Sequence, residues 1–300
     1  MGFDIQEEKM IEILHGDALE KIKLIKDKSI DCIVTSPPYW QLRDYGVLGQ
    51  LGLEDTVEEY IEKLIEIFNE CWRVLKDTGT VFVNMGDTYS NSKYISIRRK
   101  SRMMIPEKIA IIMIEKGWIL RNEIIWHKPN VFPEAVQDRF TNDFEKIYFF
   151  TKNEKYFFEK QYEAFAEKTL TAFKDGIMPT GKKKMLGAGE SRTGMREINK
   201  PWKAAYNEKG RNMRTVWKIV AKGISEAHFA TFSEELVKRC ILSGCPERGI
   251  VLDPFLGSGT TLKVAKKLNR SGIGIELNWK YIQIAKNRIG NDLFNEIQIK

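Results

Sequence analysis

Residues 250–261 read IVLDPFLGSGTT, and this stretch decides the fold class of the 300-residue chain. Its apolar start is typical of a buried strand, and the residues from Thr261 to Leu268 have the apolar spacing of a helix. Gly257 and Gly259 lie between the two, where glycine lets the backbone pass close to a ligand and the helix N-terminus offers free N–H groups. The stretch therefore predicts a strand, a ligand-binding loop and a helix, which is the building unit of an α/β fold.

Strands and helices alternate through most of the remaining sequence. Thr56 and Glu59 form a capping-box pattern, which predicts the start of a helix that ends at Asp77-Thr78-Gly79. Strands are expected at residues 11–14, 29–34, 80–84, 118–126, 146–151, 250–252 and 272–275. Further helices are expected at residues 109–116, 234–242, 261–268 and 281–288. This alternation implies a mostly parallel sheet that is covered by helices on both faces.

Basic charge is concentrated in residues 152–226. Of the chain's 48 Lys and Arg residues, 17 lie in this range, together with 9 of its 41 Asp and Glu residues. The remainder holds 31 basic and 32 acidic residues, so the net charge of +7 arises in this quarter of the chain. A basic segment of this kind suggests nucleic acid as a partner, although a lysine-rich solvated surface would look the same. Helical and strand periodicity also weakens here, which predicts a small separate domain or a long insert.

The glycine loop could hold either a phosphate or an adenosine-containing cofactor. A phosphate-binding Walker loop ends in Gly-Lys-Ser/Thr, but here Gly259 is followed by Thr260. Glu276 follows the next expected strand, 19 residues after Gly257. An acidic residue at this position can accept hydrogen bonds from ribose hydroxyls, although it could also be an ordinary surface glutamate. The pairing favours an adenosine-containing cofactor.

A second polar turn follows the expected strand at residues 29–34. It reads Ser36-Pro37-Pro38-Tyr39. Two consecutive prolines remove two backbone donors and stiffen the chain, which gives the Pro37 carbonyl a set direction. Together, two hydrogen bonds, to the Ser36 hydroxyl and to this carbonyl, and stacking on the Tyr39 ring could bind a planar ring that bears an amino group. The alternative is a structural, proline-rich turn with a tyrosine in the core and no ligand.

The two motifs together resemble those of the β group of DNA amino-methyltransferases. Ser36-Pro37-Pro38-Tyr39 is similar to the catalytic motif of that family, and the loop from Asp253 to Thr261 is similar to its S-adenosylmethionine motif. Their order, with the catalytic motif first and a variable segment between them, also resembles the β group. The resemblance covers residues 1–151 and 227–300. It implies a Rossmann-like, mostly parallel, seven-stranded methyltransferase sheet that is circularly permuted, with an inserted target-recognition region at residues 152–226.

The resemblance also implies a cofactor, a mechanism and a set of site residues. The cofactor is S-adenosylmethionine, no metal is needed, and Ser36 and the Pro37 carbonyl would accept the two hydrogens of an exocyclic amine while Tyr39 stacks on its ring. The amine would attack the methyl group directly, in a base flipped out of the duplex. Cofactor-binding residues on this interpretation are Asp17, His228, Phe232, Asp253, Pro254, Phe255, Gly257, Ser258, Gly259, Thr260 and Glu276.

Double-stranded DNA is the expected substrate, and the basic middle segment is expected to read it. Candidate contacts to bases or phosphates are Lys182, Lys183, Lys184, Arg192, Arg196, Arg211 and Arg214. Within the family that the chain resembles, serine at position 36 favours cytosine N4 as the target, whereas aspartate at this position is usual for adenine N6. Methylation at cytosine C5 is disfavoured because the chain lacks the Pro-Cys nucleophile motif.

Two other classes of function stay open: a non-catalytic nucleic-acid-binding protein with this fold, and a nucleotide hydrolase, which the absent loop lysine disfavours. The polar, acidic segment from Met1 to Lys9 and the four scattered cysteines suggest a cytoplasmic protein without a signal peptide, a membrane span or a disulfide framework. Whether the protein is a monomer or a homodimer, and whether a cognate restriction endonuclease accompanies it, are left open.

Overall fold

The structure, a computed structural model, describes residues 10–91, 97–131, 133–167, 209–221, 223–224, 227–230, 232–290 and 297–300. The chain divides into two compact units. The larger one consists of residues 1–159 and 215–300, and the smaller one of residues 160–214. The smaller unit lies within the range for which the sequence predicts a target-recognition region.

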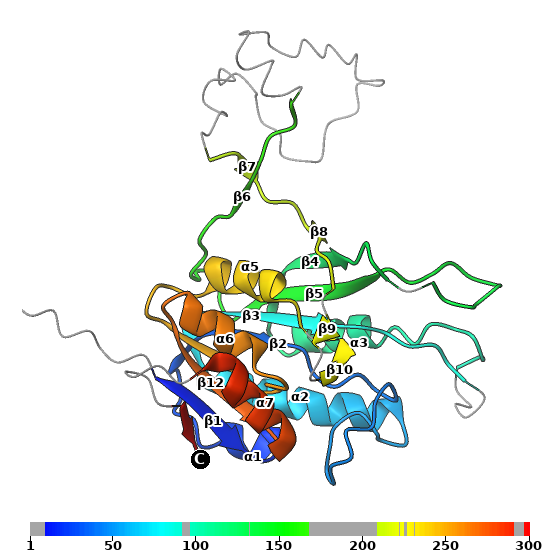
Figure 1. Cartoon of the computed structure of the whole chain (residues 1–300), viewed down its shortest axis with the longest axis horizontal. Helices are drawn as coiled ribbons and strands as arrows, with labels where there is room; N and C mark the ends of the chain where they lie inside the picture. Colours follow the sequence, from blue (N-terminus) through cyan, green and yellow to red (C-terminus); the bar gives the residue numbers. More distant parts are fainter. Residues whose placement is uncertain are drawn as a thin grey trace, which may run out of the picture. The chain divides into compact units, whose positions relative to one another are not determined.

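A nine-stranded sheet forms the centre of the larger unit (Figure 1). In sheet order its strands are β13 (Ile297–Ile299), β1 (Ile11–His15), β12 (Ser271–Glu276), β11 (Ile250–Asp253), β2 (Ile30–Thr35), β3 (Leu75–Met85), β5 (Phe144–Thr151), β4 (Ile119–His127) and β8 (Val216–Lys218). Every neighbouring pair is parallel except the two pairs that contain β5. Because parallel strands point the same way, the carboxyl ends of β1, β12, β11, β2 and β3 share one edge of the sheet.

The sheet confirms the expected fold class. All seven strands expected from the sequence lie side by side at its centre, and the short strands β13 and β8 add one strand at each end. In the sheet order, β12 and β11 from the C-terminal part of the chain lie between β1 and β2 from its N-terminal part. This arrangement agrees with the circular permutation that the sequence predicts.

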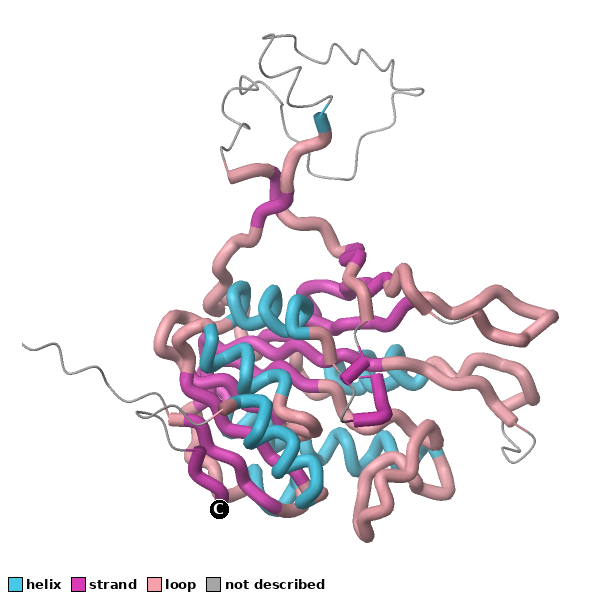
Figure 2. The backbone as a smooth tube through the Cα atoms, viewed as in Figure 1, coloured by secondary structure: helices cyan, strands magenta, loops and turns pink. Residues whose placement is uncertain are grey.

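Helices cover both faces of the sheet (Figure 2). They are α1 (Ala18–Ile22), α2 (Val57–Val74) and α3 (Ile105–Glu115) on one face, and α5 (Glu234–Gly244), α6 (Thr260–Lys267) and α7 (Trp279–Ile289) on the other. Alternation along β2 and β3 explains the two-sided burial. Ile33 and Val81 join the α2 core, whereas Cys32, Thr80 and Phe82 lie against Gly244 of α5.

Local sequence accounts for the main elements. Strand β2 is buried along its whole length, as expected for a strand covered on both faces. Helix α2 begins where Thr56 accepts a hydrogen bond from the Glu59 amide, at 3.2 Å, as the capping pattern predicts. Its apolar stripe then packs on the sheet. The helix ends at Val74, earlier than expected, because residues from Leu75 onward pair with β2. Ser233 precedes α5 but makes no side-chain capping bond.

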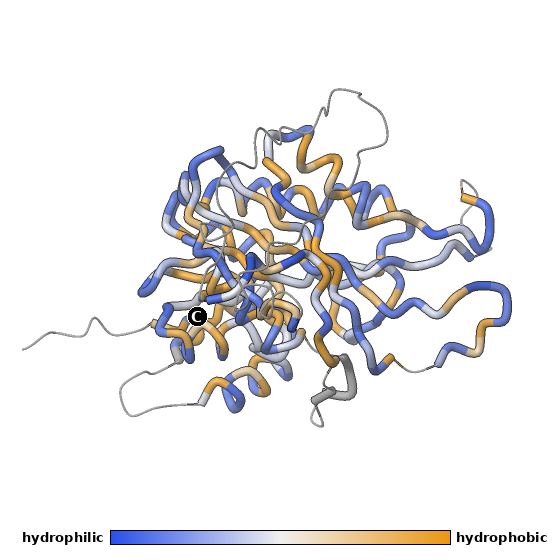
Figure 3. The backbone as a smooth tube through the Cα atoms, turned by 90° about the horizontal axis from the view of Figure 1, so that it is seen from above, coloured by the Kyte–Doolittle hydropathy of each residue, from blue (hydrophilic) through white to orange (hydrophobic). Residues whose placement is uncertain are grey.

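Two short strand pairings lie outside the nine-stranded sheet. In the larger unit β9 (Gly223–Ile224) pairs with β10 (Ala227–Ala230), and in the smaller unit β6 (Tyr162–Glu163) pairs with β7 (Arg211–Asn212), both antiparallel. Hydrophobic colour follows much of the central strands and the packed helix faces, and the projecting loops are largely hydrophilic (Figure 3). Within the described part of the chain, none of the helices is both long and apolar enough to span a membrane.

The packing of α2 yields a stability prediction. Phe68 is 1% exposed in the core between α2 and the sheet. Phe68→Ala should lower the free energy of unfolding by roughly 3–5 kcal/mol, because it leaves a cavity in a packed core. Urea unfolding followed by circular dichroism measures this change. The exposed Glu62→Ala on the same helix should change it by less than about 0.5 kcal/mol, and equal effects of the two substitutions would contradict the packing.

Candidate functional site

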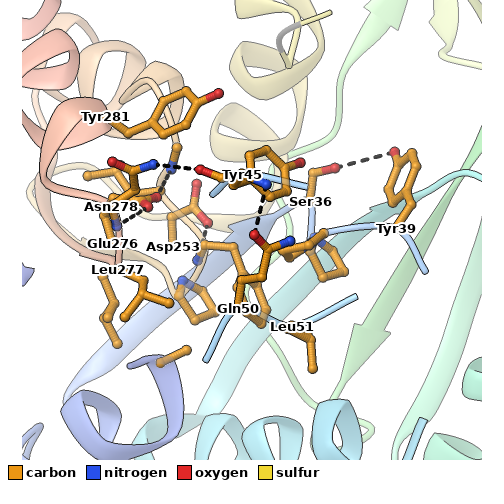
Figure 4. Close-up of a pocket in the computed structure, with 18 of the residues that line it drawn as sticks. Ser36, Tyr39, Tyr45, Gln50, Leu51, Asp253, Glu276, Leu277, Asn278 and Tyr281 are labelled. Atoms are coloured by element: carbon orange, nitrogen blue, oxygen red, sulfur yellow. Dashed lines mark hydrogen bonds between the residues drawn. The ribbon is translucent and has the colours of Figure 1, made fainter. Parts of the chain in front are cut away.

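A cavity of about 520 Å³ opens at the edge of the sheet where the parallel strands end (Figure 4). All of the catalytic and cofactor residues predicted from the sequence line it except Gly259, with His228 left aside because its side chain is outside the described structure. Strands β1, β12, β11 and β2 contribute the residues that directly follow or end them: Asp17, Glu276, Asp253 and Ser36. The topology therefore brings together two motifs that are separated by more than two hundred residues.

Asp253, the last residue of β11, lies buried beneath the cavity. One carboxylate oxygen accepts hydrogen bonds from the Thr35 hydroxyl at 2.7 Å and the Phe255 amide at 3.1 Å, and the other accepts from the Thr261 hydroxyl at 2.6 Å. Burial raises the pKa of Asp253 to about 6, against the lowering effect of these three donors. The carboxylate thus joins the end of β2, the glycine loop and the start of α6.

The glycine loop has two conformational requirements. Gly257 has φ of +54°, and a Cβ at this position would come no closer than 4.0 Å to another residue, the Phe255 carbonyl, which leaves room for a ligand. Gly259 has φ of +83° and lies against Ala285 of α7, where a Cβ would approach within 2.7 Å. Gly259 therefore serves helix packing and does not line the cavity. The Ser258 side chain is held by Arg288, whose guanidinium donates to its hydroxyl at 2.6 Å.

Glu276 ends β12 opposite the glycine loop. Its carboxylate accepts hydrogen bonds from the Gly257 amide at 2.7 Å and from the Asn278 amide at 2.8 Å. Burial raises its pKa, and the two amides oppose this shift. The arrangement places a carboxylate beside the loop on the cavity wall, as the spacing of Gly257 and Glu276 in the sequence predicts.

The Ser36-Pro37-Pro38-Tyr39 turn lines the wall of the cavity that continues from β2. The Pro38 carbonyl accepts a hydrogen bond from the Tyr60 hydroxyl at 2.8 Å, which anchors the turn to α2. Among the described residues no donor reaches the Pro37 carbonyl. Gly86 provides space for the Tyr39 ring, because a Cβ there would come within 2.6 Å of it.

A polar network behind the turn was not predicted from the sequence. The Tyr39 hydroxyl donates to Glu145 of β5 at 2.8 Å, and the Asn84 amide of β3 donates to both of these groups, at 2.8 and 2.7 Å. Lys128, which follows β4, forms an ion pair with Glu145 and lies 4.3 Å from the centre of the Trp126 ring. Burial, followed by the charge of Glu145, raises the pKa of Tyr39 well above its ordinary value, so its hydroxyl stays protonated.

The loop that follows Trp40 also lines the cavity and was missed. Tyr45 packs edge-on against Tyr281, with ring centres 6.1 Å apart, and its carbonyl accepts a hydrogen bond from Asn278 at 3.3 Å (Figure 4). The Gln50 side chain fixes the loop by accepting from the Tyr45 amide at 2.7 Å. The sequence signal for a compact loop was the close spacing of Gly46, Gly49 and Gly52. All three glycines have positive φ in the structure.

Some of the remaining predicted residues lie in the described structure, and others lie outside it. Asp17 caps α1 by accepting from the Glu20 amide at 3.1 Å, and Phe232 lines the cavity. The backbone of His228 belongs to β10, and its side chain lies outside the described structure. In the smaller unit Arg211 and Arg214 both form ion pairs with Glu163, at 2.8 and 2.6 Å. The other candidate DNA contacts, Lys182, Lys183, Lys184, Arg192 and Arg196, lie outside the described residues.

The fold and this site define the class of methyltransferases with a Rossmann-like sheet. Two solved structures share the fold. The first is the cytosine-N4-specific PvuII DNA methyltransferase, with 19% identity and a TM-score of 0.64, over 96% of this chain and 91% of that one. The second is the putative DNA modification methylase TTHA0409 of Thermus thermophilus, solved with S-adenosyl-L-methionine, with 24% identity and a TM-score of 0.59, over 96% of this chain and 99% of that one.

The sequence identifies the family within this class. Residues 30–287 match the family model described as DNA methylase, which groups N6 and N4 methyltransferases. The chain is 36% identical to the Type II methyltransferase M.Cfr9I of Citrobacter freundii, over 96% of this chain and 90% of that protein. It is 35% identical to M.SmaI of Serratia marcescens, over 93% and 90%. The chain belongs to this DNA methylase family and is a DNA methyltransferase.

The raised pKa of Asp253 predicts how stability changes with pH. A carboxyl group whose pKa is higher in the folded than in the unfolded protein binds its proton more tightly when folded. Its contribution is fully present below about pH 4, the unfolded pKa, and is lost as the pH rises through 6. From pH 4 to 7 the unfolding free energy of Asp253→Asn should therefore rise relative to the wild type, by up to roughly 3 kcal/mol.

Urea unfolding of the wild type and of Asp253→Asn across this pH range measures the difference between their unfolding free energies. The contributions of the other titrating groups cancel in this difference. The exposed Asp77→Asn serves as the matched control and should give a difference that does not rise with pH. A difference for Asp253→Asn that is independent of pH would show that this carboxyl group titrates normally.

Proposed function

We propose that this enzyme transfers a methyl group from S-adenosylmethionine to the exocyclic N4 of cytosine in a short duplex DNA target. One observation carries the proposal: a single cavity holds the glycine loop with Asp253 and Glu276 on one wall and the turn at Ser36–Tyr39 on the other. A cofactor and a target base could therefore lie side by side. Direct transfer needs this proximity, because reacting atoms must be held close together and in line.

The residues on the cofactor wall fit S-adenosylmethionine. The open space at Gly257 admits an adenosine, and the Glu276 carboxylate would accept hydrogen bonds from its ribose hydroxyls. Asp253 would attract the cofactor's amino group, Phe232 would contact its methionine part, and Asp17 would lie near the adenine. His228 stays a prediction from the family resemblance. When bound, the cofactor supplies a methyl group activated by a positively charged sulfur.

The residues on the opposite wall fit an aromatic amine. The lone pair of such an amine is delocalised into its ring, which makes the nitrogen a poor nucleophile. Ser36 and the Pro37 carbonyl would each accept one amine hydrogen and so turn the lone pair out of the ring plane. The Pro37 carbonyl suits this role because no described donor occupies it, whereas the Pro38 carbonyl is bonded to Tyr60. Tyr39 would stack on the base, which must leave the duplex to reach the cavity.

Serine at position 36 supports cytosine N4 rather than adenine N6 as the target. We propose the range 152–226 as the target-recognition region, with its basic residues as contacts to DNA. Arg211 and Arg214 would have to leave Glu163, or share it, to contact a base or phosphate.

The Type II names of the relatives support a place for this enzyme in a restriction-modification system, with a restriction endonuclease of the same target as its partner. Its four cysteines are unpaired and buried, which suits a reducing cytoplasm.

The target base can be identified directly. Purified protein incubated with S-adenosylmethionine and unmethylated genomic DNA should produce N4-methylcytosine, detected by mass spectrometry of the digested nucleosides. Tyr39→Ala should lower the yield by roughly 100-fold or more, because positioning of the amine supplies much of the rate. Tyr156→Ala, a tyrosine outside the cavity, should keep the activity.

Other products would revise the proposal in different ways. N6-methyladenine would overturn the choice of base but keep the mechanism. Binding of S-adenosylmethionine without any methylated nucleoside would point to RNA as the substrate. The absence of both product and cofactor binding would favour a non-catalytic DNA-binding protein.

The pKa of Asp253 also predicts how cofactor affinity depends on pH. The cationic amino group of the cofactor would favour ionised Asp253, whose pKa is about 6 in the free protein. Affinity should therefore fall by up to about tenfold for each pH unit below 6. Calorimetric titration between pH 5 and 7 measures it. Asp253→Asn should bind more weakly and with a shallower dependence on pH. An unchanged affinity in Asp253→Asn would remove this carboxylate from the cofactor site.

A further inference from the structure

A continuous chain of hydrogen-bonding groups leads from Ser36 into the protein. The Ser36 hydroxyl lies 3.3 Å from the Tyr39 hydroxyl, which donates to the Glu145 carboxylate at 2.8 Å. The Ser36 hydroxyl can donate to Tyr39, since the Tyr39 proton is already directed at Glu145. The Asn84 amide donates to the Ser36 oxygen at 3.4 Å, which leaves the second lone pair of this oxygen available to accept a hydrogen from a ligand in the cavity. A separation of 3.3 Å is long for two hydroxyls, but bonds of this kind often tighten when the substrate binds.

The carboxylate at the end of this chain is part of a largely buried ion pair on the cavity wall. Glu145 and Lys128 line the cavity together, with side chains 17% and 14% exposed. Removing an ion pair from water costs free energy that apolar side chains of similar size would not cost. The residues that follow Glu145 on β5 are mostly apolar and buried. A paired carboxylate retained on the wall of a reaction cavity is better explained by chemistry than by stability.

We propose that Glu145 is the final acceptor of the proton that the target amine loses, and that Tyr39 and Ser36 carry this proton to it. The inference rests on the proposed function, since it requires an amine substrate held at Ser36. It gives the Tyr39 hydroxyl a role that is separate from stacking of its ring.

The step balances in atoms and charge. The bond from methyl carbon to sulfur breaks as the bond from methyl carbon to nitrogen forms, and the positive charge passes from sulfur to nitrogen. The nitrogen–hydrogen bond then breaks and its proton moves to the Ser36 oxygen. Ser36 passes its own proton to the Tyr39 oxygen, and Tyr39 passes its own to Glu145. The products are a neutral methylamine, two regenerated hydroxyls and a carboxylic acid, which releases its proton to solvent before the next turnover.

The groups around Glu145 suit this role. The Asn84 amide donates to Tyr39 and Glu145 at once and holds them in contact. Tyr39 and Lys128 are the charged or titratable groups that the described structure places against the Glu145 carboxylate. Lys146, with its partners Glu107 and Glu123, lies on the other face of β5, because adjacent strand residues point to opposite faces.

Two variants test the relay with the full-length protein. Glu145→Gln keeps the shape of the side chain but cannot accept a proton, and Tyr39→Phe keeps the ring but removes the hydroxyl. Single-turnover methylation of unmethylated genomic DNA, with S-adenosylmethionine and DNA both saturating, should be slower by about 100-fold or more in each variant. The double variant should be no slower than the slower single variant, because both break one chain.

Binding measurements separate the relay from a structural role. Calorimetry with S-adenosylmethionine and filter binding with genomic DNA fragments should give wild-type affinities in both variants. Glu123→Gln on β4, which faces away from the cavity, is the matched control and should keep the wild-type rate. A wild-type rate in Glu145→Gln, or a full rate in Tyr39→Phe, would overturn the relay alone. A loss of rate that only accompanies lost binding would overturn it as well. A wild-type protein that makes no methylated amine would overturn the proposed function and the relay with it.

Discussion

The buried carboxylate of Asp253 is the interaction on which the site depends. Its oxygens bind the hydroxyls of Thr35 and Thr261, which come from opposite halves of the chain. Thr35 directly precedes Ser36, and Thr261 lies in the first turn of α6. The position of the catalytic turn relative to the glycine loop is therefore set by one side chain. Because this side chain is buried and hydrogen-bonded at short distances, the two walls of the cavity cannot shift independently.

Parallel pairing of the strands places the residues of this interaction next to one another. Strand β11 lies between β12 and β2, so the segments that follow these three strands emerge beside one another. Glu276, Asp253 and Ser36 are then neighbours along one edge, although the catalytic turn comes first in the chain. The permuted order of the motifs has no effect on the geometry of the site, because an α/β sheet is defined by which strands pair and not by where the chain begins.

The burial of charge on the cavity wall divides the site into two chemical environments. Asp253 and Glu276 both have raised pKa values on the cofactor wall, where a cation would compensate their burial. On the opposite wall Glu145 has Lys128 as a built-in partner. The carboxylates of the cofactor wall thus have no cationic partner of their own among the hydrogen bonds described above, whereas the carboxylate beside Tyr39 is balanced by Lys128.

The sequence alone was sufficient for the fold class, the seven central strands and both motifs, because burial periodicity, glycine and proline act locally. It was also sufficient for the family, since the two motifs are specific in type and order. Tertiary structure decided that Gly259 packs on Ala285 and that the loop at residues 41–54 lines the cavity. It also decided that Asn84, Lys128 and Glu145 meet behind Tyr39. These three residues end or flank separate strands, and their meeting depends on the pairing of β3, β5 and β4, which is a long-range choice that no local pattern encodes.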